Sequence, residues 1–425
     1  MIARAIWPRA LGALIILIVV IGLARCAPVQ PPARPSARSG PTTVLLVSLD
    51  GFRADYLDRG LTPAISRIAR EGVRAEWMSP SYPSLTFPNH YTIVTGLRPD
   101  HSGVVHNTMR DAQLGGFSMS NPAAVTNASW WGGEPVWVTA EKAGLPTAIL
   151  FWPGSEAAIH GVRPRRFLPY DEPMTASSRV DGVISWLREP DATRPRFVSL
   201  YLQNTDDAGH RGGPSSTVVR DGIREIDIAL GRLRDGLIAA GRWDLTDLVL
   251  VSDHGMATVP AGNVIAIEDM VDPEDALAVT VGQSVGFVPR SGREREAIAK
   301  LVGPHRQYDC WSKEDLPLRW HYGTNPRIPP IVCQMHEGWD AVPRTVLAKR
   351  PLEARGSHGF DPSLKSMRAI FVARGPSLRH GVKLPPIENV DVYSLLMRLL
   401  GLEPLANDGN PRALAGAFAE PVSRP

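Results

Sequence analysis

Residues 44–51 read Val-Leu-Leu-Val-Ser-Leu-Asp-Gly, and this stretch indicates the fold class of the chain. An apolar run that ends at an acidic residue and a glycine is typical of a buried strand in a parallel sheet. Residues 197–202 and 247–252 form similar runs, and Asp253-His254-Gly255 follows residues 247–252 directly. Between them, residues 217–240 carry apolar side chains every three or four positions, as an amphipathic helix does. The alternation predicts an α/β fold, a doubly wound and mostly parallel sheet flanked by helices.

Further elements fit the same alternation. A helix is expected over Ala64–Arg70, because Pro63 suits its first turn and Gly72 follows its last. Near the end of the chain, Ala369–Ala373 is expected to form a strand and Val390–Leu400 a helix.

One long segment departs from this pattern. Residues 259–355 contain many prolines and only short strand-like pieces, so we expect an inserted subdomain that caps the sheet. The main domain is then expected to span residues 42–410, followed by a C-terminal tail over residues 411–425. In such sheets ligands gather at the carboxyl ends of the strands. Asp50 and Asp253, which both end strands, are therefore expected to meet.

The N-terminal residues are predicted to lie outside the folded domain. Residues 1–26 begin with Arg4 and Arg9 and continue with an almost wholly apolar run, Leu11–Ala24, which suits a secretory signal better than a membrane span. Cys26 follows a lipoprotein-like box in which Arg25 replaces a small residue, so lipidation, an uncleaved anchor and ordinary cleavage all stay open. Residues 27–41 are rich in Pro, Ser, Ala and Arg and indicate an extended tether. We therefore expect an exported protein that is periplasmic or membrane-anchored and faces the periplasm.

Composition limits the classes of partner and cysteine chemistry. The 425 residues include 46 Lys and Arg and 43 Asp and Glu, for a formal net charge of +3, and no dense basic block lies outside Pro-rich sequence. A nucleic-acid polymer is therefore a poor candidate partner. In an exported protein Cys310 and Cys333 could form a disulfide, with two free buried thiols as the alternative.

Metal-ligating residue types gather in four places along the chain. They are Asp50, the segment Asp206-Asp207-Ala208-Gly209-His210, the pair Asp253-His254, and His358. Carboxylates at adjacent strand ends would repel one another, and a divalent cation removes that repulsion. Mixed Asp and His ligands suit zinc. Three of these four Asp residues and the three His residues would divide between two ions, the arrangement that supports in-line displacement at phosphorus.

The stretch Ser81-Tyr82-Pro83-Ser84-Leu85-Thr86-Phe87-Pro88-Asn89-His90 contains a candidate nucleophile. Pro88 predicts that a helix begins just after Thr86, which places the hydroxyl at the positive end of the helix dipole. Such a position favours an alkoxide or a bound phosphate. Thr86 could also be an ordinary capping residue. A threonine hydroxyl needs a metal or a base to become a nucleophile at neutral pH.

Taken together, these motifs resemble the nucleotide pyrophosphatase/phosphodiesterase family of the alkaline phosphatase superfamily. The resemblance covers most of the chain from Val44 to about Asn410 and includes segments similar to bacterial members. It is carried by Leu46–Leu57, Tyr82–Asn107, Asp206–Pro214, Ser252–Met256, Ser357–Asp361, Ala128–Glu156 and Asn389–Gly401.

The resemblance implies an alkaline-phosphatase-like fold and a two-zinc site. One zinc would be held by Asp206, His210 and His358, and the other by Asp50, Asp253 and His254 with Thr86 as its bound nucleophile. Asn107 would hold a non-bridging phosphate oxygen together with the Thr86 backbone N–H. His90, His101, His106 and His321 are expected to have core or supporting roles.

The resemblance also implies a substrate and a product. Phe87 and Tyr170 would form an aromatic slot that stacks a nucleobase, which tolerates any base. The expected reaction is hydrolysis of nucleotide phosphodiester and pyrophosphate bonds to nucleoside 5'-monophosphates through a nucleotidyl-threonine intermediate. Alternatives are a choline-type phosphodiester substrate, phosphonoacetate, or a non-catalytic exported binding protein. A sulfatase is disfavoured because Leu85 stands where the sulfatase motif needs arginine.

Overall fold

The computed structural model describes Met1 and residues 42–350 and 353–419. The described residues from 42 onwards belong to one compact unit. The predicted leader and tether, Met1 apart, lie outside the described residues. None of the described helices is both long and apolar enough to cross a membrane.

An eight-stranded sheet forms the centre of this unit, in the order β20-β2-β19-β9-β1-β8-β6-β7. Its three central strands are β9, β1 and β8, and they run parallel to one another. The strands are β1 (Thr43–Leu49), β2 (Val73–Ala75), β6 (Thr147–Leu150), β7 (Arg166–Leu168), β8 (Phe197–Leu202), β9 (Thr246–Val251), β19 (Phe371–Arg374) and β20 (Val382–Leu384). Only β19 runs antiparallel to its neighbours in this sheet. The prediction of a mostly parallel α/β sheet is thus confirmed.

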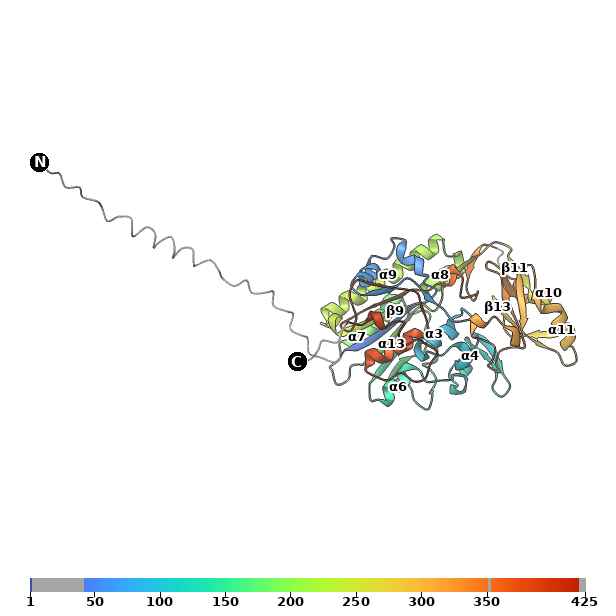
Figure 1. Ribbon diagram of the computed structural model, residues 1–425, viewed down its shortest axis with the longest axis horizontal. Coiled ribbons are helices and arrows are strands. Elements are labelled where there is room, and N and C mark those ends of the chain that lie inside the picture. Colours follow the sequence, from blue (N-terminus) through green and yellow to red (C-terminus); the bar gives the residue numbers. More distant parts are fainter. Residues whose placement is uncertain (2–41, 351–352, 420–425) are drawn as a thin grey trace. The chain divides into compact units, whose positions relative to one another are not determined.

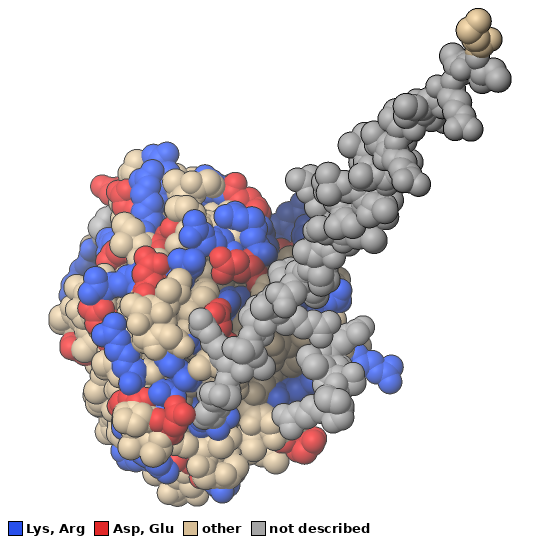
Figure 2. All heavy atoms as spheres, turned by 90° about the vertical axis from the view of Figure 1, so that its left-hand side faces the viewer, with Lys and Arg blue, Asp and Glu red and all other residues tan. Residues whose placement is uncertain are grey.

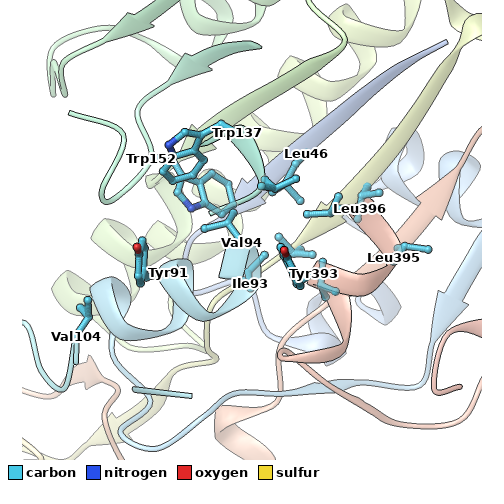
Figure 3. Close-up of a cluster of buried hydrophobic side chains, with 14 of the residues drawn as sticks. Leu46, Tyr91, Ile93, Val94, Val104, Trp137, Trp152, Tyr393, Leu395 and Leu396 are labelled. Atoms are coloured by element: carbon cyan, nitrogen blue, oxygen red, sulfur yellow. The ribbon is translucent and has the colours of Figure 1, made fainter. Parts of the chain in front are cut away.

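Helices cover both faces of the sheet, and alternate residues of β1 contribute to two separate cores. Leu45, Val47 and Leu49 pack into the core beneath α2 (Pro63–Arg70), α7 (Ala176–Leu187) and α9 (Thr217–Ala239). Val44 and Leu46 pack on the opposite side, against α3 (Thr86–Thr95), α6 (Val136–Lys142) and α13 (Asp391–Leu400). Figure 3 shows side chains of this second core, including Leu46, Val94 of α3 and Leu396 of α13. Burial on both faces explains why β1 is an unbroken apolar run rather than an alternating one.

A second sheet is built from residues 276–335. It is five-stranded and antiparallel, in the order β12-β13-β16-β15-β14, and has its own hydrophobic core. Its strands are β12 (Ala276–Ala278), β13 (Ser284–Pro289), β14 (Gly303–Pro304), β15 (Tyr308–Ser312) and β16 (Ile331–Met335). Cys310 and Cys333 lie opposite each other on β15 and β16 and form a disulfide. In Figure 1 this sheet, with α10 (Ile267–Met270) and α11 (Glu294–Leu301), lies at the end of the unit away from α7 and α9.

On one face of the molecule, charge is mixed rather than gathered in blocks (Figure 2). On the face shown in Figure 2, Lys and Arg side chains alternate with Asp and Glu side chains. This face offers no continuous basic track of the kind that follows a phosphate backbone.

Candidate active site

Three neighbouring strands bring their carboxyl ends to one edge of the central sheet. Asp50 follows β1 directly, and Asp253 and His254 follow β9 after Ser252. The strand β8 leads into α8 (Asn204–Gly212), which carries Asp206 and His210 one helical turn apart. Because β9, β1 and β8 are adjacent and parallel, these side chains converge.

The first group of possible metal ligands consists of Asp50, Asp253 and His254, which are all fully buried. His254 Nε2 lies 2.9 Å from Asp253 Oδ2 and 3.6 Å from Asp50 Oδ1. The Thr86 hydroxyl lies 3.4 Å from the same Nε2 atom. The structure therefore brings Thr86 to the group with which the resemblance associates it.

The second group is centred on Asp206. Its Oδ2 lies 3.4 Å from His210 Nε2, and its Oδ1 lies 3.6 Å from His358 Nε2. The His358 ring stacks on the His254 ring with centroids 3.6 Å apart, so the two groups are contiguous. The ligating atoms of Asp206, His254 and His358 also lie close enough together to share one ion.

The three histidines present the same ring nitrogen to the site. His254 Nδ1 faces the Gly255 carbonyl at 2.9 Å, and His358 Nδ1 faces the Ser84 carbonyl at 3.0 Å. His210 Nδ1 faces the Gly356 carbonyl at 3.2 Å. A carbonyl can only accept, so each Nδ1 carries the hydrogen and each Nε2 is left to accept or to bind a metal.

The carboxylates also leave oxygens without hydrogen-bond partners. Within the described chain, the buried atoms Asp50 Oδ1, Asp206 Oδ1 and Asp253 Oδ2 lack a hydrogen bond. Each lies toward a histidine Nε2, whereas Asp50 Oδ2 accepts the Tyr201 hydroxyl at 2.6 Å. Unpartnered buried oxygens opposite imidazole acceptors fit divalent cations and little else.

Burial and neighbouring charges shift the pKa values of Asp50 and His358 strongly. Burial, and then the charges of Asp253 and Asp206, raise the pKa of Asp50 well above its usual value. Burial, and then the neighbouring His254 and His210, lower the pKa of His358 well below its usual value. A neutral imidazole is the form that binds a metal. The residues present therefore fit a site for metal ions.

The candidate nucleophile lies at the start of α3. The helix begins at Thr86 and ends before Gly96, whose φ of 67° is left-handed. Asn107 Oδ1 accepts the Phe87 N–H at 3.0 Å, and this contact fixes the amide beside the first turn of the helix. The Asn107 amide nitrogen has no hydrogen bond among the described residues, so it is available to a ligand.

Two supporting residues were not assigned to the site from the sequence. His90 is fully buried, with Nε2 2.7 Å from Ser48 Oγ and Nδ1 2.8 Å from the Thr86 carbonyl. The same Nδ1 lies 3.4 Å from Asp253 Oδ2. Tyr201 contacts Asp50 from β8. The only signal in the sequence for His90 was its place one helical turn after Thr86, and Tyr201 had none beyond lying in a strand.

The two aromatic residues predicted to bind substrate lie in different surroundings. Phe87 packs against Phe117 and Trp131, with ring centroids 6.0 Å apart in each case. Tyr170 is 49% exposed, and its ring contacts Phe151 and Tyr201. Across the described residues, no ring contact joins Phe87 to Tyr170. The two rings thus stand apart.

Known proteins resemble this chain over most of its length. A family model described as "Type I phosphodiesterase / nucleotide pyrophosphatase" matches residues 44–361. Human ectonucleotide pyrophosphatase/phosphodiesterase family member 1 is 34% identical over 415 residues, which cover 94% of this chain and 44% of the human protein. An uncharacterized pyrophosphatase/phosphodiesterase of Schizosaccharomyces pombe is 37% identical over 383 residues, which cover 87% of this chain and 79% of the yeast protein.

A solved structure shows the same likeness. An inactive form of murine ectonucleotide pyrophosphatase/phosphodiesterase 5, in complex with AMP, is 33% identical with a TM-score of 0.84. The match covers 89% of this chain and 100% of the murine chain. These relatives are eukaryotic, and this chain spans less than half the length of the human relative.

Proposed function

The chain belongs to the type I phosphodiesterase / nucleotide pyrophosphatase family, and on this premise we propose that it is a hydrolase of nucleotide phosphodiester and pyrophosphate bonds. The product would be a nucleoside 5'-monophosphate. The observation that carries the proposal is the position of the Thr86 hydroxyl beside two contiguous Asp and His groups at the start of a helix. The nucleotide class is supported by the AMP bound to the murine relative.

We propose two zinc ions as the cofactors. Asp206, His210 and His358 would hold one ion, and Asp50, Asp253 and His254 would hold the other with Thr86. When bound, the ions would supply charge that lowers the pKa of the nucleophile and stabilises the leaving oxygen. The three Nδ1–H to carbonyl contacts support this assignment, because they orient each imidazole before an ion arrives.

The residues of this chain define a two-step displacement. The Thr86 oxygen attacks the α-phosphorus, a phosphorus–oxygen bond to the leaving group breaks, and a nucleotidyl-threonine ester forms. Water then attacks the same phosphorus, which releases the nucleoside monophosphate and restores the Thr86 hydroxyl. The Asn107 amide, whose Oδ1 accepts the Phe87 N–H, and the backbone N–H of Thr86 would donate to the phosphoryl oxygens.

Replacing the nucleophile tests this function. Thr86→Ala should abolish turnover of the p-nitrophenyl ester of thymidine 5'-monophosphate. Thr92→Val is a matched control, because Thr92 lies in the same helix and its buried hydroxyl has no partner in the described chain. Full activity of Thr86→Ala would contradict the mechanism. Wild-type protein that contains zinc but hydrolyses phosphonoacetate instead of nucleotides would contradict the substrate.

We also propose that the protein is an exported bacterial enzyme, either free in the periplasm or tethered through its N-terminus. The support is the composition of residues 1–41. Mass spectrometry of the mature N-terminus should show either a lipid on Cys26 or a cleaved end near it. An intact Met1 on a soluble cytoplasmic protein would contradict export.

We further propose residues 42–410 as the catalytic domain and residues 259–355 as a subdomain inserted into it. The second sheet and its separate core support this division.

A further inference from the structure

Arg179 of α7 is among the largest side chains that the fold buries completely. No carboxylate lies within ion-pair distance of its guanidinium in the part of the chain that the structure describes. A buried charge without a counter-ion is costly unless hydrogen bonds replace its water. The hydrogen bonds of the Arg179 guanidinium therefore have to replace the water that it loses on burial.

Those contacts join the segment after Tyr170 to the end of β8. On one side Arg179 Nε donates to the Met174 carbonyl at 2.8 Å, and Nη2 donates to the Asp171 and Glu172 carbonyls at 3.2 Å and 3.4 Å. On the other side Nη1 donates to the Tyr201 carbonyl at 3.0 Å and to Gln203 Oε1. The planar guanidinium thus fixes the distance between residues 171–174 and β8.

The same guanidinium also lies against two aromatic rings. Its carbon Cζ is 4.8 Å from the Phe151 ring centroid and 5.8 Å from the Tyr170 ring centroid. The two rings meet edge to face with centroids 5.5 Å apart. Phe151 has a φ of 58°, which is strained for an aromatic residue and persists only where packing holds it.

This cluster links the exposed Tyr170 ring to the metal-ligand side of the site. Tyr170 contacts the Tyr201 ring at 6.1 Å, and Tyr201 donates its hydroxyl to Asp50. Tyr170 itself has few anchors, since it is half exposed and its backbone N–H donates to Glu156 at 3.2 Å. Arg179 is the residue that connects this ring, its backbone segment and β8.

We propose that Arg179 is a positioning residue for the substrate's nucleobase: it holds Tyr170 at a fixed place relative to the phosphorus-binding side of the site. The inference rests on the proposed nucleotide hydrolase function and on the expectation, from the family resemblance, that the base stacks on Tyr170. It assigns to Arg179 a role in binding the base and none in the chemical step. Replacing Arg179 should therefore leave KM and kcat unchanged for substrates that have no base.

The test compares a nucleotide substrate with one that has no base. Arg179→Met should raise the KM of the thymidine 5'-monophosphate ester about tenfold, the size of a lost base–aromatic stack. Its kcat, and the KM and kcat of bis(p-nitrophenyl) phosphate, should stay within about twofold. Arg188→Met is the matched control, because Arg188 is exposed at the end of the same helix, and it should change neither substrate.

A double-mutant cycle separates positioning from general destabilisation. If Arg179 acts through Tyr170, adding Arg179→Met to Tyr170→Ala should not raise the nucleotide KM further. Arg179→Lys keeps the charge but loses the planar guanidinium. It should raise the KM of the nucleotide substrate alone, by less than Arg179→Met does, and it replaces Arg179→Met in the test if that variant does not fold.

Two results would overturn the inference: equal KM changes for both substrates, or effects at Arg179 and Tyr170 that multiply. The proposed function fails separately, if the wild-type protein cleaves neither substrate.

Discussion

Tyr201 shows how one hydroxyl can orient a candidate metal ligand. It donates to Asp50 Oδ2 at 2.6 Å, which turns the unpartnered Oδ1 toward His254. Burial, and then the nearby Asp50 charge, raise the pKa of Tyr201 well above its usual value, so it keeps its hydrogen at any physiological pH. Hydrogen bonds to a ligating carboxylate support both its direction and its affinity.

We therefore expect Tyr201→Phe to weaken zinc binding about tenfold or more while the fold is retained. The measurement is zinc affinity against a competing chelator, together with activity as a function of free zinc. Tyr56→Phe is the control, because Tyr56 is buried in the core against which Tyr201 packs, and its hydroxyl has no hydrogen-bond partner in the described chain. A zinc dependence that Tyr201→Phe leaves unchanged would show that the hydroxyl has no part in the site.

At the scale of elements, local sequence patterns predicted the start of a helix but missed the shortest strands. Pro88 indicated a helix that begins just after Thr86, and α3 begins at Thr86 itself. The strands β2, β6, β7 and β20 escaped prediction because runs of three or four residues carry too little periodic signal. The contact of Tyr201 with Asp50 could not be predicted either, since it depends on the register in which Tyr201 pairs with Ser48 across β1 and β8.

A second element-scale feature joins α4 (Pro99–Ser102) to the segment between η5 (Leu318–Trp320) and β16. The Asp100 carboxylate accepts the backbone N–H groups of Gly323, Thr324 and Asn325 at 2.9–3.0 Å. Burial alone would raise the pKa of Asp100, but the Thr324 hydroxyl and these N–H groups outweigh it and lower the pKa. The charged carboxylate is therefore favoured in the folded state.

We expect Asp100→Asn to lower the free energy of unfolding by about 2 kcal/mol at pH 7, as a lost set of hydrogen bonds to a charged group should. A depressed carboxyl pKa stabilises above the unfolded value of about 3.9, and this contribution is lost as pH falls through the folded value. The difference between wild type and Asp100→Asn should thus shrink below about pH 4.

Urea unfolding at pH 7 and at acid pH measures the Asp100 effect. The exposed Asp315→Asn, in the same inserted segment, should have little effect at either pH. A stability difference between wild type and Asp100→Asn that does not depend on pH would contradict the assignment to the carboxylate charge.

The whole molecule gathers the site from distant parts of the chain. Asp50 and His358 are separated by most of the sequence. Adjacency of β9, β1 and β8 brings the carboxylates together with His210 of α8 and with His358, which follows β18 (Arg355–Ser357). The family motifs indicated which residues would meet. They could not give the distances, or the burial that leaves three carboxylate oxygens without partners. The distances and the burial depend on how distant segments of the chain pack at the strand ends.

Metal removal should therefore change the stability of the whole unit and not only its activity. Without a cation, the carboxylates of Asp50, Asp253 and Asp206 lie close together, and burial, followed by the charges of Asp253 and Asp206, raises the pKa of Asp50. Exhaustive chelation should lower the Tm, because an ion that binds only the folded state stabilises it by mass action.

Asp50→Asn should have opposite effects on the Tm of the metal-loaded protein and on that of the chelated protein. It should lower the Tm of the zinc-loaded protein and raise that of the chelated protein by about 2 °C, since the amide removes one buried charge. Asp227→Asn is the control, because its carboxylate accepts the N–H groups of Ala64 and Ile65 away from the site, so both forms should lose stability alike. Calorimetry of the two variants, with zinc and with chelator, measures all four values. A chelated Asp50→Asn that melts below the chelated wild type would show that Asp50 is not held there against repulsion.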